Sequence, residues 1–304
     1  MRLFYIAEIT GKAGVWAVKK SIALIKRTYR PDFIIANAHT ATGAGGLGKQ
    51  HAGYLKKMGI DCITGGDNIF QKKDLVEALS QLPFVVRPAN IPAQSPGKGL
   101  RYFSTRSGEK LAVVSLLGRV GRHRLLADNP FTLMQETLPE IEKETRFIVA
   151  DFSSTATAEK QTMAFFLAGK ISALIGSGTG AATADDRLMP ENADTPDGGR
   201  KTAFITDAGR TGSFDSVGGH DPAGKIREYR TGLLSIRRIR GSGCVCKDWI
   251  LRLTEKAAPV QSNGFVLSFL EKKIRWKIAK NCKSVGFADE ASSKSSPEFF
   301  ADTQ

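Results

Sequence analysis

Cysteine is scarce in this sequence, and long apolar runs are missing from it. Four cysteines among 304 residues are too few for a disulfide framework, which excludes the small secreted scaffolds that depend on one. No apolar run approaches the roughly 18–20 residues that span a bilayer. The carboxylate of Glu8 follows the first residues too closely for a secretory signal. We therefore expect a cytoplasmic protein without a transmembrane segment.

Acidic residues are in the minority: 44 Lys and Arg face 30 Asp and Glu, which gives a formal net charge of +14. Much of the excess lies in residues 233–283, where twelve basic residues accompany three acidic ones. A basic surface attracts an acidic protein or a nucleic acid, although a solvated strand face shows the same pattern. The residues that we expect to bind an anionic partner are Arg237, Arg238, Arg240, Lys272, Lys273, Arg275 and Lys277.

Short apolar runs alternate with helical periodicity through the first two-thirds of the chain. The β-α-β-α-β order over residues 3–82 predicts a parallel sheet covered by helices. Further strands are predicted at 100–104, 110–116, 147–151, 171–175 and 202–207, and further helices at 129–144 and 157–167. We divide the chain into an α/β body (1–232), a basic β-rich C-terminal part packed on the same body (233–283) and a Ser-rich flexible tail (284–304).

Polar residues and glycines follow several of the predicted strands. In open α/β sheets, ligands bind outside the carboxyl ends of the strands. Those ends fall here at residues 7–11, 36–40, 64–68, 151–153 and 175–180. We expect these segments to converge on one crevice.

Unusual strings of residues occur in a fixed order between residues 1 and 240. They are Arg87-Pro88-Ala89-Asn90-Ile91-Pro92, Pro96-Gly97-Lys98-Gly99, Asp151-Phe152 followed by Glu159-Lys160, and Ile205-Thr206-Asp207-Ala208-Gly209-Arg210-Thr211-Gly212. Together they resemble the YmdB-like branch of the calcineurin-type metallophosphoesterases, a bacterial group that includes 2′,3′-cyclic-nucleotide phosphodiesterases. The resemblance implies a metallophosphoesterase-like α/β sandwich of mixed sheets flanked by helices. It also implies two metal ions and a catalytic histidine at the strand ends.

The chain departs from this family at each position that the resemblance assigns to the metals or to the catalytic histidine. The metal positions carry Glu8, His39, Thr40, Asp67, Ser153, Gly178 and Gly180, and the catalytic-histidine position carries Asn68. Glycine offers no side-chain ligand, and an amide does not donate a proton near pH 7 as histidine does. Glu8, His39 and Asp67 could bind one divalent metal weakly, but this set does not rebuild two metal sites.

These departures favour a catalytically inactive scaffold, a pseudoenzyme that acts as a structural or regulatory binding subunit and needs no cofactor. Its expected partner is another protein or a second copy of the chain. Two alternatives stay open. One is an active metal-dependent phosphodiesterase with a site rebuilt on Glu8, His39 and Asp67, and the other is a nucleic-acid-binding protein that uses residues 233–283. Four arginines near the predicted crevice could hold an anion, although a structural role is favoured for the first: Arg119, Arg122, Arg124 and Arg210.

Overall fold

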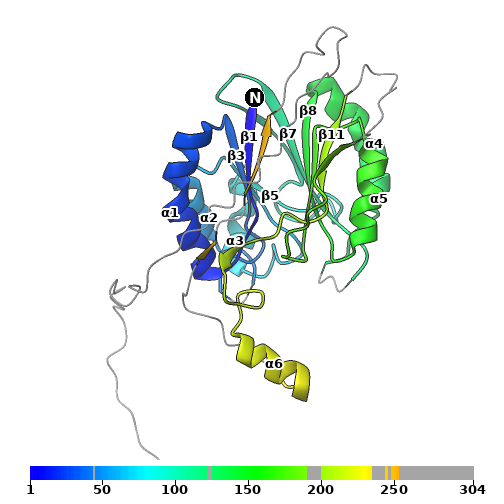
Figure 1. The fold of residues 1–304 in the computed structure, drawn as a ribbon. Helices are drawn as coiled ribbons and strands as arrows, with labels where there is room; N and C mark the ends of the chain where they lie inside the picture. The colour runs from blue at the N-terminus through cyan, green and yellow to red at the C-terminus, as the bar shows by residue number, and fades with distance from the viewer. Residues whose placement is uncertain (44, 122–124, 190–199, 235–243, 246–247, 253–304) are drawn as a thin grey trace, which may run out of the picture.

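Two mixed sheets lie face to face with helices on their outer sides (Figure 1). This arrangement comes from a computed structural model that describes all residues except 44, 122–124, 190–199, 235–243, 246–247 and 253–304. The predicted α/β sandwich of mixed sheets flanked by helices is confirmed. The proposed domain boundaries at 232/233 and 283/284 stay predictions, because residues 253–304 lie outside the described residues.

The first sheet contains the parallel strands that the β-α-β-α-β order predicts. Its strand order is β14 (Asp248–Arg252), β1 (Arg2–Ile6), β3 (Phe33–Asn37), β4 (Cys62–Thr64) and β5 (Val85–Val86). Strands β1, β3, β4 and β5 are parallel, and β14 pairs antiparallel with β1 at the edge. The helices in this half of the chain are α1 (Gly11–Tyr29), α2 (Lys49–Lys57) and α3 (Lys73–Ala78), with a 3₁₀ turn at Leu79–Gln81.

The second sheet is built mostly from the middle of the chain. Its strand order is β10 (Arg187–Met189), β11 (Thr202–Ile205), β9 (Ala173–Ser177), β8 (Phe147–Ser153), β7 (Lys110–Leu117) and β6 (Leu100–Ser104). Strands β7, β8, β9 and β11 are parallel, whereas β6 and β10 are antiparallel edges. Helices α4 (Pro130–Glu144) and α5 (Thr157–Leu167) cover its outer face (Figure 1).

Strand β1 shows why the two sheets pack as they do. Alternate residues of a strand point to opposite faces, and all of β1 after Arg2 is buried. Leu3 and Tyr5 pack between the two sheets, whereas Phe4 and Ile6 pack in the cluster that contains the buried face of α1. A strand that is covered on both faces reads as a continuous apolar run, as this one does.

A third, small sheet joins the two large ones at the carboxyl end of their parallel strands. Its strand order is β13 (Cys244–Val245), β12 (Arg210–Ser213) and β2 (Glu8–Ile9). Strands β12 and β2 pair in parallel, with Arg210 opposite Glu8 and Thr211 opposite Ile9. This pairing places two charged residues from distant parts of the sequence side by side at the predicted crevice.

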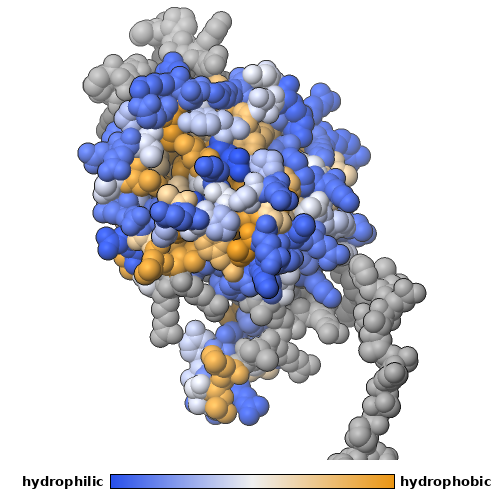
Figure 2. Space-filling view, turned by 180° about the vertical axis from the view of Figure 1, so that it is seen from behind, coloured by the Kyte–Doolittle hydropathy of each residue, from blue (hydrophilic) through white to orange (hydrophobic). Residues whose placement is uncertain are grey.

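Helix α6 (Pro222–Thr231) projects from the same end of the sandwich, opposite the N-terminus (Figure 1). None of its residues is buried, and the apolar side chains of Ile226 and Tyr229 are exposed. Viewed from behind, α6 again stands clear of the body, whose surface mixes hydrophilic residues with smaller hydrophobic patches (Figure 2). Among the described helices, none is long and apolar enough to cross a membrane.

Candidate functional site

The structure brings most of the predicted site residues together at the carboxyl ends of the strands. Thr40 Oγ1 donates a hydrogen bond to Glu8 Oε1 at 2.7 Å, and His39 Nε2 lies 3.0 Å from Asp67 Oδ1. A Cβ atom built on Gly66 would lie 2.4 Å from His39 Nδ1 and 2.9 Å from Ser153 Oγ. The expected convergence is therefore confirmed for these side chains, which follow or end β1, β3, β4 and β8.

The side chain of His39 is 12% exposed and is held on two sides within this cluster. Its backbone N–H donates to Asn37 Oδ1 at 3.0 Å, and Asn68 Nδ2 lies 2.8 Å from Nε2. Burial works against the imidazolium form, but the hydrogen bond to Asp67 and the negative charges of Glu8, Asp67 and Asp151 outweigh it and raise the pKa of His39 above 6.5. Nδ1 is buried and has no hydrogen-bond partner among the described residues.

Gly178 and Gly180 lie in the loop that follows β9, where the backbone conformation favours glycine. Their φ angles are +108° and +70°, a region that other residues rarely adopt. A Cβ on Gly178 would lie 2.8 Å from the Ser154 carbonyl oxygen, and one on Gly180 would lie 2.3 Å from Arg210 Nη2. The space in which a side chain at position 180 would begin is occupied by the guanidinium of Arg210.

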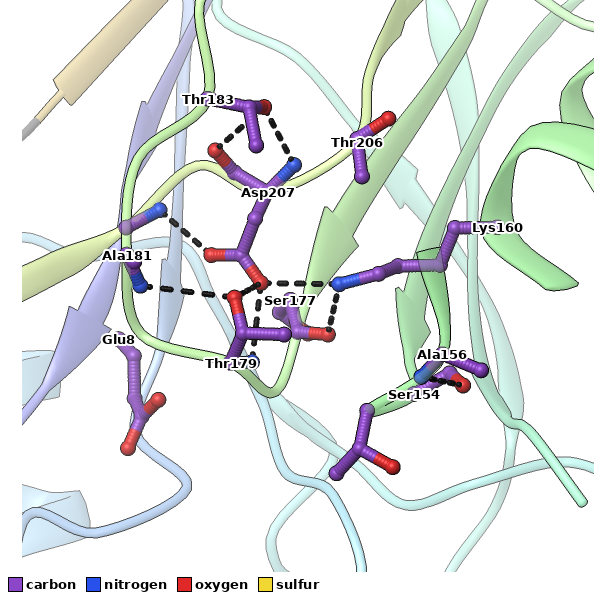
Figure 3. Close-up of polar contacts among 12 residues, drawn as sticks. Glu8, Ser154, Ala156, Lys160, Ser177, Thr179, Ala181, Thr183, Thr206 and Asp207 are labelled. Atoms are coloured by element: carbon purple, nitrogen blue, oxygen red, sulfur yellow. Dashed lines mark hydrogen bonds and ion pairs between the residues drawn. The ribbon is translucent and has the colours of Figure 1, made fainter. Parts of the chain in front are cut away.

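A buried ion pair holds this loop in place (Figure 3). Lys160 Nζ donates to Asp207 Oδ2 at 2.9 Å and to the Ser177 carbonyl oxygen at 3.2 Å, and both charged side chains are fully buried. Asp207 Oδ2 also accepts from the Thr179 N–H at 3.0 Å and from Thr179 Oγ1 at 2.7 Å, while Oδ1 accepts from the Gly209 N–H at 2.8 Å. One carboxylate thus fixes the glycine loop relative to the turn that precedes β12.

Four important residues were not among the predicted site residues. Asp151, Lys160 and Asp207 belong to the unusual strings, and of the three only Asp151 lies inside an apolar strand, where a charged residue indicates a buried polar network. Arg210 was noticed as a possible anion-binding residue, but its neighbour Glu8 depends on the β12–β2 register. The seven basic residues of segment 233–283 that we expect to bind an anionic partner lie outside the described residues.

The described side chains do not fit a dinuclear metal centre. No group of three or more His, Cys, Asp or Glu in the described part of the chain is arranged to hold a metal ion. Glu8 Oε1 accepts from Thr40, Glu8 Oε2 faces Arg210, and Asp67 faces His39. Glu8, His39 and Asp67 are thus engaged with neighbours rather than converging on one point, so we derive no reaction step through a metal.

Comparison with known proteins identifies the class to which this fold and cleft belong. A family described as YmdB-like protein matches residues 4–259. The chain is 35% identical over 233 residues to a 2′,3′-cyclic-nucleotide 2′-phosphodiesterase of Bacillus subtilis, across 77% of this chain and 84% of that protein. It is also 31% identical over 238 residues to a putative phosphatase/phosphodiesterase of Mycoplasma genitalium, across 76% and 80% of the two chains.

A solved structure gives the same result. The crystal structure of a phosphatase from Mycoplasma pneumoniae superimposes with a TM-score of 0.73 at 27% identity, covering 83% of this chain and 87% of that one. The two-sheet sandwich with its polar strand ends is therefore a phosphoesterase fold. The chain belongs to the YmdB-like family.

The interpretation of the chain as a catalytically inactive scaffold is wrong. Two relatives that match about three-quarters of the chain are named as phosphodiesterases or phosphatases, and the family is enzymatic. The relatives therefore support the alternative, an active phosphodiesterase. The physical reason for the difference is that a missing side chain at one position does not show which groups from distant sequence lie beside it, such as Arg210 beside Gly180 and Asp67 beside His39.

Membership of this family also corrects the expectation that no cofactor is needed. The family that the sequence resembles is metal-dependent. This supports the alternative stated above, in which the chain binds one divalent metal. The protein partner, the second copy of the chain, the nucleic acid and the cytoplasmic location stay predictions.

Proposed function

We propose that this chain is a phosphodiesterase that opens 2′,3′-cyclic nucleotides in the cleft at the carboxyl ends of β1, β3, β4, β8 and β9. One observation supports this proposal: Glu8, His39, Thr40 and Asp67 form a polar cluster at the carboxyl ends of the strands in a chain that is 35% identical to a B. subtilis enzyme of this kind. The reaction adds the hydroxyl of water to phosphorus and a proton to the departing ribose oxygen.

His39 is the proton-transfer residue of this proposal. Asp67 contacts Nε2 and fixes the orientation of the ring, so Nδ1 is the atom that gives a proton to the ribose oxygen or takes one from water. Nδ1 faces the same point as Ser153 Oγ. Both atoms lie against Gly66, and Nδ1 is buried, so a phosphate ester would reach this proton carrier and hydroxyl donor only after the ring or Gly66 shifts.

Negative charge on the attacked phosphate needs a positive group or hydrogen-bond donors nearby. The cleft offers the hydroxyls of Thr40 and Ser153 and the guanidinium of Arg210. A divalent metal, if one binds, would add charge stabilisation and a more acidic water. The residues of the chain would in either case orient the ester and exclude solvent from the buried side of the cleft.

Turnover of the four 2′,3′-cyclic nucleotides, followed by chromatography, tests the proposal. We expect hydrolysis by the wild-type chain and a loss of roughly 10²- to 10⁴-fold in kcat/KM for His39→Ala, the range for removal of a proton-transfer group. Parallel assays with EDTA and with added Mn²⁺ report any metal requirement. His51→Ala is the matched control, because His51 pairs with Thr42 outside the cluster and should leave the rate unchanged.

Two outcomes would contradict the proposal. The first is a folded wild-type chain that opens none of the four nucleotides under either metal condition. The second is an activity that His39→Ala leaves intact, because it would belong to another site or to a contaminating enzyme.

A partner for residues 233–283 is a separate proposal that rests on charge alone. The net charge of +14 and the basic residues of this segment support binding to an acidic protein or a nucleic acid, and binding to phosphates would weaken steeply with salt. Retention on an RNA column at increasing salt tests it, with a chain ending at residue 252 as the comparison. Equal elution of the two chains would argue against this proposal.

A further inference from the structure

Arg210 lies at the start of β12, where the strand register places it next to Glu8 of β2. Its guanidinium lies between two turns, because a Cβ atom on Gly180 of the glycine loop would lie 2.3 Å from Nη2 and one on Gly218, between β12 and α6, would lie 3.0 Å from Nη1. Both glycines have positive φ angles, +70° and +62°. Because neither glycine has a side chain, the backbone at Gly180 and Gly218 leaves space for a cationic group. The guanidinium of Arg210 occupies that space.

Within the described part of the chain, most N–H donors of this guanidinium have no hydrogen-bond acceptor. A guanidinium has five N–H donors in a fixed fork, and charge-assisted bonds to a carboxylate are normally about 2.7–2.9 Å long. Arg210 Nη2 lies 3.6 Å from Glu8 Oε2, and Arg210 Nε is buried without a hydrogen-bond partner among the described residues. The exposed N–H donors of the fork are therefore available to an acceptor other than Glu8.

The chemistry of that acceptor follows from the shape and charge of the guanidinium. A planar fork of N–H donors matches the oxygen atoms of a phosphate or carboxylate in a bidentate manner. The side chain of Arg210 is 24% exposed, whereas that of Glu8 is 3% exposed, so a ligand can approach the arginine from the cleft. Ligands of open α/β sheets bind at this edge, outside the carboxyl ends of the strands.

We propose that Arg210 is a phosphate-binding residue of this cleft and that its guanidinium supplies, beside Glu8, positive charge that requires no metal ion. Glu8 then acts as an internal counter-ion that holds Arg210 until a phosphate takes its place. This inference rests on the proposed function for its ligand class. It also accounts for the poor fit of a dinuclear centre, because a divalent cation at Glu8 would lie next to a guanidinium of like charge.

Binding of inorganic phosphate to the full chain in EDTA, measured by calorimetry, tests the proposal without turnover. We expect wild-type binding, at least tenfold weaker binding by Arg210→Met, and an intermediate affinity for Arg210→Lys, which keeps the charge but loses the fork. Arg227→Met is the matched control, because Arg227 is exposed on α6 and should bind as wild type does.

Glu8→Gln distinguishes a counter-ion from a metal ligand. If Glu8 competes with phosphate for Arg210, the neutral and nearly isosteric amide should strengthen phosphate binding severalfold in EDTA. If Glu8 instead holds a metal that binds the phosphate, the same change should weaken binding, and binding should need added Mn²⁺. This variant keeps the test decisive even where Arg210→Met fails to fold.

The proposal is overturned if wild-type chain binds phosphate only with a divalent metal, or if Arg210→Met binds as tightly as wild type. Turnover of cyclic nucleotides together with either result would remove this inference and leave the proposed function standing. Phosphate binding through Arg210 without turnover of any cyclic nucleotide would support this inference and remove the proposed function.

Discussion

Asp151 lies between the two sheets, where its carboxylate accepts hydrogen bonds from both of them. Tyr5 Oη donates at 3.1 Å, Asn37 Nδ2 at 3.0 Å and Ser177 Oγ at 2.9 Å, and Thr64 Oγ1 is a fourth donor. Burial raises the pKa of Asp151, although these four hydrogen bonds favour the charged form. One carboxylate therefore positions strands β1, β3, β4 and β9 relative to β8 beneath the cleft.

Replacement of this carboxylate by an amide should be costly. Asp151→Asn keeps the shape but turns an N–H₂ group toward donors, so at least one buried polar group loses its partner. We expect the free energy of unfolding to fall by about 2–4 kcal/mol, measured by urea denaturation. Asp128→Asn, on a loop outside this network, is the control, and a similar small change in both variants would contradict the account.

The pKa values of two histidines should lie on opposite sides of 6.5, the ordinary value for an imidazole. The pKa of His39 is raised above 6.5, because Asp67 and nearby negative charges outweigh its burial. The pKa of His51 is lowered below 6.5 by burial and by the charge of Lys12, against a smaller opposing effect of Asp74. NMR titration of the imidazole protons checks both directions, with His39→Ala and His51→Ala for assignment.

The same shifts set the sign of the pH dependence of stability. Because the pKa of folded His39 lies above that of the unfolded chain, its stabilising contribution is complete below pH 6.5 and is lost as pH rises through the raised pKa. His51 has the opposite sign: its contribution is present above pH 6.5 and is lost as pH falls through the lowered pKa. Shifts of the two rings in the same direction would contradict this assignment.

The sequence predicts the position of a site residue when that position depends on a strand end, but not when it depends on the register between two strands. Glu8, His39 and Asp67 were found because the carboxyl ends of parallel strands meet at one edge, and the structure places them there. The contact of Arg210 with Glu8 depends on the register of two short strands, and neither is long enough to show a periodic pattern. Local sequence therefore locates the cleft but not the pairs within it.

At the scale of elements, the Lys160–Asp207 ion pair ties α5 to the turn before β12. Both side chains are fully buried, and removing one partner of such a pair leaves an uncompensated charge. We expect Lys160→Met to lower the free energy of unfolding by about 3–5 kcal/mol. Calorimetric or urea denaturation measures this loss.

Removing the second charge should reverse part of that loss. Asp207→Asn removes the unpaired buried charge and keeps one oxygen, which can accept from the Thr179 N–H or from the Gly209 N–H but not from both. The double variant Lys160→Met/Asp207→Asn should therefore be more stable than Lys160→Met alone. A double variant as unstable as the sum of the two single changes would show that the two residues act independently.

Long elements were predicted well and short or exposed ones were not. The strands predicted at 100–104 and 110–116 are confirmed as β6 and β7, which pair antiparallel around Gly108 at φ +87°. Helix α6 was missed, although Asp221 caps it, Pro222 begins it and Gly232 ends it. No residue of α6 is buried, so the apolar periodicity that identifies helices in a sequence is weak here.

At the scale of the whole molecule, the sequence order of strands and helices predicted the architecture, but not how the chain after residue 232 joins it. Strand β14 adds to the first sheet beside β1, and β13 adds to the small sheet beside β12. These additions come from distant sequence, and no local pattern encodes which edge a late strand will extend.

Truncation tests the contribution of these late strands. A chain that ends at residue 252 keeps β13 and β14, whereas one that ends at 232 leaves β1 as an open edge with its five pairing residues uncovered. We expect the shorter chain to melt roughly 5–10 °C lower and to aggregate more readily, as measured by calorimetry and light scattering. Equal melting temperatures would show that the α/β body is complete at residue 232.

The measurement that tests the central claim most directly is ³¹P NMR of 2′,3′-cyclic AMP with the purified chain in oxygen-18 water, with and without Mn²⁺. The account predicts that the cyclic phosphate resonance is replaced by that of a nucleotide monoester carrying one labelled oxygen, and that His39→Ala leaves the cyclic resonance in place. A cyclic resonance that persists with folded wild-type chain under both conditions would contradict it.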